Sequence, residues 1–202
     1  KSGQPDPAFR DINISLDLEK EVAETWVILA DLYFIIGQPE NSTSSLKKAL
    51  EIEPENISII LKLARTYLML RNYQTSQQYV DYVLSMDVEN PEAYYLRGIN
   101  KLEGGDTTAG ILDLKIAGNL DSTFYVAFMA EGTALSLQKD STAINAFKSA
   151  LKAKPGDERA LYVLALSYQN NDHFDKAMET YSELLKISPA NSEVLYNMGY
   201  IS

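Results

Sequence analysis

Apolar side chains recur at intervals of three and four residues along most of the chain, which is the spacing of one face of an α-helix. Three segments share one order of apolar, small and aromatic residues: Trp26-x2-Leu29-Ala30-x2-Tyr33, Ile60-x2-Leu63-Ala64-x2-Tyr67 and Leu161-x2-Leu164-Ala165-x2-Tyr168. A second pattern ends in proline, in Leu46-x2-Ala49-x4-Pro54, Phe147-x2-Ala150-x4-Pro155 and Tyr181-x2-Leu184-x4-Pro189. The alternation of the two patterns predicts pairs of helices repeated along the chain.

The repeats divide the chain into units of about 34 residues. The unit boundaries are 23–56, 57–90, 91–124, 125–157 and 158–191, and the fourth unit is one residue short. Residues 6–22, which start at Asp6-Pro7, are expected to form an N-terminal capping helix or half repeat. Residues 192–202 begin a sixth, truncated repeat, so we expect the native protein to continue past Ser202. The whole of 1–202 is predicted to be a single domain.

Small residues occupy the positions where the two helices of a unit should cross. In order, the eighth and twentieth positions hold Ala30 and Ser42, Ala64 and Ser76, Gly98 and Gly110, Gly132 and Ala143, and Ala165 and Ala177. Helix backbones approach closely only where both side chains are small, and proline after the second helix ends it. This pattern closely resembles the tetratricopeptide repeat over nearly the whole chain. The resemblance implies an all-α fold, an α-α superhelix (a solenoid of antiparallel helix hairpins).

The resemblance also implies a function, which is to bind a peptide or helix of a partner protein without catalysis. In this family the first helices of the units line a concave groove. The groove residues carried over by repeat position are Val27, Asp31, Phe34, Leu61, Arg65, Leu68, Tyr95, Ile99, Met129, Thr133, Tyr162, Leu166 and Tyr196. The same repeat positions also place Ile35, Met69 and Leu137 on the groove, and Tyr200 extends the row. An alternative for any one of these residues is that it packs between neighbouring first helices.

Other interpretations of the repeats remain open. The chain could be a self-assembly module that binds its own copies, or the regulatory repeat region of a longer protein with a domain outside these residues. One subclass of the family grips carboxylates with Lys and Asn at the fifth and ninth positions, and no unit here has that pair. Arg97 and Glu131 replace apolar residues at the seventh position of two units, and we expect them to pair, with Lys101 as another partner for Glu131.

The composition of the chain bears on its possible partners and on its compartment. Asp and Glu outnumber Lys and Arg by 28 to 18, a net charge of −10 that disfavours nucleic acid as a partner. No apolar run is long enough to insert into a membrane. The absence of cysteine suits the periplasm or cell envelope but fits the cytoplasm too, so the compartment of this soluble chain stays open.

The sequence offers no chemistry for an enzyme. His173 is the only histidine and is expected in a turn, so neither a metal site nor a catalytic residue is predicted. The glycine-rich segment from Gly104 to Gly110 lacks the Gly-Lys-Ser/Thr ending of a phosphate-binding loop, and no cofactor is predicted.

Overall fold

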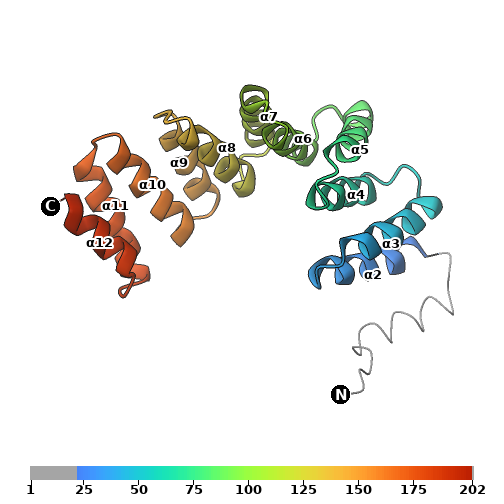
Figure 1. The fold of residues 1–202 in the computed structure, drawn as a ribbon, viewed down its shortest axis with the longest axis horizontal. Helices are drawn as coiled ribbons and strands as arrows, with labels where there is room; N and C mark the ends of the chain where they lie inside the picture. The colour runs from blue at the N-terminus through green and yellow to red at the C-terminus, as the bar shows by residue number, and fades with distance from the viewer. Residues whose placement is uncertain (1–21, 202) are drawn as a thin grey trace, which may run out of the picture. The chain divides into compact units, whose positions relative to one another are not determined.

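The computed structural model describes residues 22–201, and this part of the chain consists of helices joined by short turns (Figure 1). The helices are α2 (Ala23–Ile35), α3 (Pro39–Ile52), α4 (Ile57–Met69), α5 (Tyr73–Met86), α6 (Pro91–Glu103), α7 (Thr107–Leu120), α8 (Tyr125–Leu137), α9 (Ala143–Ala153), α10 (Glu158–Asn170), α11 (Phe174–Ile187) and α12 (Ser192–Ile201). No strand occurs among the described residues. The all-α class expected from the sequence is confirmed.

The chain separates into two compact units, Lys1–Leu96 and Arg97–Ser202, here called the N-unit and the C-unit. The division falls within α6. The capping helix expected at 6–22 lies outside the described residues, apart from Val22 at the start of α2. The repeat boundaries and the single domain stay predictions.

Helices pack chiefly against their neighbours in sequence. The closest pairs are α2 with α3, α4 with α5, α8 with α9, and α10 with α11, and Figure 1 shows each pair as a hairpin. A connection of only a few residues makes two packed helices antiparallel. In the C-unit one core cluster runs from Phe128 on α8 to Val194 on α12. Two clusters fill the N-unit, one around Ile60 and Val80 and the other around Leu46 and Leu63.

The close crossings predicted from small residues are real at two positions of the C-unit. A Cβ added to Gly98 would lie 3.0 Å from the carbonyl oxygen of Gly110, and one added to Gly110 would lie 2.9 Å from that of Gly98. These two glycines therefore let the backbones of α6 and α7 touch. At Gly132 the obstacle is a side chain instead, because an added Cβ would lie 2.5 Å from Cε1 of Phe147.

The turns inside the hairpins share one backbone conformation. Each contains a residue with positive φ: Gly37 (72°), Arg71 (56°), Gly105 (89°), Lys139 (58°) and Asp172 (58°). The following amide then donates to a carbonyl five residues earlier, as from Asp140 to Leu135 at 3.0 Å and from Gln38 to Tyr33 at 2.8 Å. This is the usual left-handed end of a helix, where glycine is favoured because it has no Cβ.

In three of these five turns the residue with positive φ is not glycine, and its Cβ is sterically disfavoured in that conformation. Glycine at such a position should therefore stabilise the protein. We expect Lys139→Gly to raise the free energy of unfolding by about 1 kcal/mol, because a side chain in the left-handed region costs roughly that much. Lys152→Gly is the matched control, since Lys152 is also exposed but lies in helix α9. The control should lose about 0.5–1 kcal/mol. Urea denaturation followed by circular dichroism measures both, and a loss of stability in Lys139→Gly would refute this account of the turn.

The expected pairing of Arg97 with Glu131 was wrong about the acceptor. Arg97 donates through Nε and Nη2 to the two carboxylate oxygens of Asp113 on α7, each at 2.8 Å. Lys101 Nζ lies 2.6 Å from Oδ2 of the same carboxylate, whose side chain is 3% exposed. Burial alone raises the pKa of Asp113, but the bonds from Arg97 and Lys101 outweigh it and hold the pKa below its ordinary value. Two cations thus share one buried carboxylate inside the α6–α7 hairpin.

Glu131 lies in a different environment. Burial raises the pKa of its carboxyl, and the charge of Lys115 on α7 partly opposes that rise. Lys115, rather than Lys101, is therefore the cation that acts on Glu131.

Candidate protein-binding surface

The first helices of successive hairpins are joined by polar contacts within each unit. In the N-unit Lys62 Nζ on α4 donates to both carboxylate oxygens of Asp31 on α2, at 2.7 and 2.9 Å. Arg65 on α4 pairs with Glu92 on α6. These contacts place α2 beside α4 and α4 beside α6, so that their side chains form one continuous surface.

In the C-unit the corresponding contacts start from tyrosine hydroxyls. Tyr125 on α8 donates to Oδ1 of Asp157, the N-cap residue of α10, at 2.7 Å. Burial, together with this carboxylate, raises the pKa of Tyr125 to about 12. Tyr162 on α10 donates to Glu193 Oε1 on α12 at 2.5 Å and accepts from Asn197 Nδ2 at 3.3 Å. The first helices of the C-unit therefore also lie side by side.

Two of the thirteen residues predicted for the groove are core residues. Leu61 is 5% exposed and packs with Ile60 and Leu96, and Met129 is 7% exposed and packs with Phe128. They fill the space between neighbouring first helices, which was the alternative left open for each position. The substitution Leu61→Asp would therefore disrupt the core, so a loss of binding in that variant would not show that Leu61 contacts a partner.

The polar groove residues are engaged within the protein. Asp31 and Arg65 hold the interhelical ion pairs, and Thr133 Oγ1 donates to the carbonyl oxygen of Met129 at 2.7 Å. These contacts hold the polar side chains of the surface in defined positions. Both ion pairs are partly exposed, where such pairs contribute little to stability.

Apolar and aromatic side chains remain accessible at two places on the first helices. In the N-unit Ile35 is 77% and Met69 50% exposed, next to the partly exposed Phe34 and Leu68. We call these four residues the N-unit patch. In the C-unit Tyr196 is 74% and Tyr200 76% exposed, on the helix that contacts Tyr162.

Tyr196 and Tyr200 lie one turn apart on α12, so they share a face of that helix. With the partly exposed Tyr162 and Leu166 of α10 they make up the C-unit patch. The remaining predicted residues, Val27, Tyr95 and Ile99, are half-buried. Burial, which outweighs the opposing charge of Arg65, raises the pKa of the Tyr95 hydroxyl.

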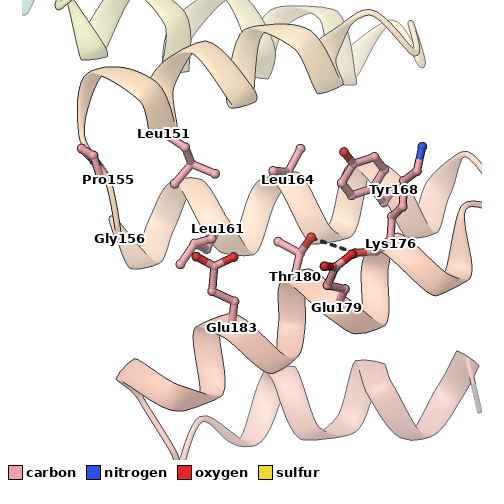
Figure 2. Close-up of a pocket in the computed structure, with 10 residues that line it drawn as sticks. All are labelled: Leu151, Pro155, Gly156, Leu161, Leu164, Tyr168, Lys176, Glu179, Thr180 and Glu183. Atoms are coloured by element: carbon pink, nitrogen blue, oxygen red, sulfur yellow. Dashed lines mark hydrogen bonds between the residues drawn. The ribbon is translucent and has the colours of Figure 1, made fainter.

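The sequence did not predict a cleft that lies on the second-helix side (Figure 2). It lies between α9 and α11, with α10 as its floor, and has a volume of about 460 Å³. Repeat positions marked its floor residues Leu161, Leu164 and Tyr168 as core, and they are buried. The sequence held no clear signal of it, because Thr180 stands at a position where one repeat carries Tyr79 and others carry the small residues Ser45 and Ala146.

Within residues 22–201 no three His, Cys, Asp or Glu side chains come together in a way that could hold a metal ion. His173 is an exposed residue at the start of α11, with its ring 6.2 Å from that of Tyr168. No helix among those described is long and apolar enough to cross a bilayer.

The chain is similar to parts of two longer proteins. It is 23% identical over 177 residues to the BBSome complex member BBS4 of Bos taurus, which covers 84% of this chain and 33% of that protein. It is 22% identical over 211 residues to the mitochondrial import receptor subunit TOM70 of Homo sapiens, covering 97% of this chain and 34% of that one. The chain thus spans about a third of the length of these two relatives.

Solved structures share the fold. The crystal structure of MamA superposes with a TM-score of 0.66 at 22% identity, covering 86% of this chain and 96% of MamA. YrrB, described as a TPR protein with an unusual peptide-binding site, superposes with a TM-score of 0.61 at 19% identity, covering 92% and 96%.

Three tetratricopeptide repeat family models match the chain, at residues 23–56, 45–78 and 139–198. Together they cover more than half of the 202 residues. With the helical hairpins and the shared fold, these matches show that the chain belongs to the tetratricopeptide repeat family.

Proposed function

We propose that this protein is a binding scaffold whose first helices hold a peptide or helix of a partner protein. The observation that carries the proposal is the exposure of large apolar and aromatic side chains in the two patches, above all Ile35, Tyr196 and Tyr200. Clustered apolar side chains are seldom left in water without a binding role. Tyrosine is enriched at the energetic centres of interfaces because it combines a large apolar ring with a hydroxyl group.

The form of the patches suits an amphipathic helix or an extended apolar segment. In each patch the exposed side chains come from two neighbouring helices, so a ligand lying across them would contact both. Met69 has a flexible side chain that adapts to different apolar partners. The surrounding ion pairs Lys62–Asp31 and Arg65–Glu92 would form a polar rim.

The comparisons support an interaction role without identifying the partner. TOM70 is named as an import receptor subunit, BBS4 as a member of a complex, and YrrB as a protein with a peptide-binding site. Each of these three descriptions involves association with a protein or a peptide.

Exposed residues allow a test that leaves the core intact. We expect the variant Ile35→Asp, Met69→Asp, Tyr196→Asp and Tyr200→Asp to lose partner capture by about tenfold or more, because charges would replace the apolar contacts. Capture from an extract of the source organism, quantified by mass spectrometry, measures the loss. The matched control is Tyr82→Asp and Leu112→Asp, two exposed apolar residues on the second helices α5 and α7. Equal capture by the patch variant and the control would overturn the proposal.

Self-association is a second candidate, favoured by the cluster of Leu195, Tyr196 and Tyr200 that stays exposed on α12. In this case α12 of one copy would bind the C-unit patch of another. Light scattering over a range of concentrations decides between the two, because self-association predicts a mass that rises with concentration. A mass that stays at the monomer value would exclude self-association, and binding of a different partner protein would remain as the proposed function.

A further inference from the structure

The cleft between α9 and α11 has an apolar floor and a charged rim (Figure 2). Leu161, Leu164 and Tyr168 of α10 form the floor, and Leu151 of α9 closes one side. The other side is a row of α11 residues, Lys176, Glu179, Thr180 and Glu183. One end is bounded by Pro155 and Gly156, and a Cβ added to Gly156 would meet only Ile187, at 3.9 Å.

Charges of opposite sign lie towards opposite ends of the cleft. At the Tyr168 end, Lys148 Nζ lies 5.7 Å and Lys176 Nζ 5.8 Å from the centre of the tyrosine ring. Towards the Gly156 end, Glu183 stands on the rim, and Glu179 lies between it and the lysines. In the described part of the chain none of these four side chains forms an ion pair. Their charges are therefore available to a ligand.

The repeat itself shows why this cleft is open. Tyr67 of α4 corresponds to Tyr168, and Lys47 lies 5.7 Å from its ring centre as Lys148 does from that of Tyr168. In the N-unit, however, Tyr79 of α5 stacks on Tyr67, with 5.8 Å between ring centres and 13° between ring planes. Thr180 lies as far after the start of α10 as Tyr79 does after the start of α4. A small residue thus replaces the ring that covers the equivalent tyrosine in the N-unit.

We propose that this cleft is a second binding site, on the second-helix side, for an extended peptide segment that carries an acidic, an apolar and a basic side chain in that order or its reverse. The apolar side chain lies on Leu161 and Leu164, the acidic one meets Lys148 and Lys176, and the basic one meets Glu179 and Glu183. Lysine ammonium groups beside an aromatic ring are well placed to bind a carboxylate while the ring supports an apolar neighbour.

The dimensions favour an extended ligand. Lys176 and Glu183 are seven residues apart on one helix, or about 10 Å, which about three extended residues span. An α-helix with its side chains is roughly 10–12 Å across, so a single turn would fill a volume of this size. A small anion alone would be repelled by the glutamates, and a small cation by the lysines. A chain that carries both charges is the ligand that satisfies the whole rim.

The test is selection of a displayed library of random peptides of about eight residues against the full chain. We expect the selected peptides to share an apolar residue flanked by opposite charges about three positions apart. Their affinity, measured by fluorescence polarisation, should fall about tenfold or more in Lys148→Glu with Lys176→Glu, and also in Thr180→Tyr, which copies the residue of the N-unit.

Two controls separate this site from other causes. Lys47→Glu makes the same charge change at the equivalent lysine of the N-unit and should leave the affinity unchanged. The patch variant described above should also still bind the selected peptides, so failure of the first-helix proposal would not affect this result. Because Lys148 and Lys176 are exposed, their double variant keeps the test valid even if Thr180→Tyr fails to fold. Selection of no peptide, or of peptides that bind the cleft variants unchanged, would overturn the proposal.

Discussion

Replacing Asp113 with Ala should lower the free energy of unfolding by about 3–5 kcal/mol, because it leaves two partly buried cations without their carboxylate. Asp113 is paired with both Arg97 and Lys101, with contacts of 2.6 to 2.8 Å. Desolvated charges are tolerated only when they are paired. Urea denaturation monitored by circular dichroism gives the difference from the unchanged protein.

A variant that removes all three charges distinguishes unpaired charge from lost packing. This triple variant combines Arg97→Met, Lys101→Met and Asp113→Leu. Its free energy of unfolding should lie within about 1 kcal/mol of that of the unchanged protein, since an apolar cluster of similar volume often replaces a buried ion cluster without loss of stability. A triple variant as unstable as Asp113→Ala would instead indicate that the shapes of these side chains matter more than their charges.

The same carboxylate predicts how stability depends on pH. The pKa of Asp113 is lowered in the folded state, so its contribution is complete above the unfolded pKa of about 4 and is lost as the pH falls through the folded pKa. The difference in unfolding free energy between the unchanged protein and Asp113→Ala should therefore shrink on acidification below about pH 4. A difference that stays constant down to pH 2 would contradict the assignment.

Replacing Phe147 with Ala should cost about 3–5 kcal/mol, the usual loss for a large aromatic side chain in a core. Phe147 on α9 is 1% exposed, and its ring lies against Gly132 of α8. The chain therefore uses a glycine on one helix to make room for a phenylalanine on the next.

A double variant tests whether the two residues depend on each other. Gly132→Ala alone should cost about 1–3 kcal/mol, because its Cβ would lie 2.5 Å from Cε1 of Phe147. In the Phe147→Ala background the same change should cost less by about 1 kcal/mol or more, since the ring is gone. Additive losses, measured by the same urea titrations, would show that the ring moves aside and that Gly132 is not needed for its size.

Much of the fold was predictable because each helix pair repeats one pattern of apolar and small residues. Gly98 and Gly110 stand where two backbones must touch, and that requirement is visible in the sequence as soon as the units are aligned. The turns were harder. Arg71 and Lys139 adopt the same conformation as Gly37 and Gly105 although their side chains do not favour it, and among the three non-glycine residues only Asp172 is of a type that tolerates it. Tertiary contacts of the two helices impose that turn whatever residue occupies it.

The candidate surface was only partly predictable. Repeat position alone cannot tell Leu61, which is buried, from Tyr196, which is exposed. Leu61 on α4 is covered by the next first helix, α6, whereas no first helix is described after α12 to cover Tyr196. Asp113 was missed for a different reason. It lies three residues after Gly110 and four before Ala117, within the buried stripe of α7, so attention to an acidic residue in that stripe would have identified the partner of Arg97.

The most direct test of the scaffold role is hydroxyl-radical footprinting of the protein with and without its captured partner. Met69 and Tyr196 report on the two patches, and Met86 and Tyr82 are exposed residues of the same types on the second helix α5. We predict that the partner slows oxidation of Met69, Tyr196 or both, and leaves Met86 and Tyr82 unchanged. Protection of Met86 and Tyr82 with undiminished oxidation of Met69 and Tyr196 would contradict the proposal that the first helices hold the partner.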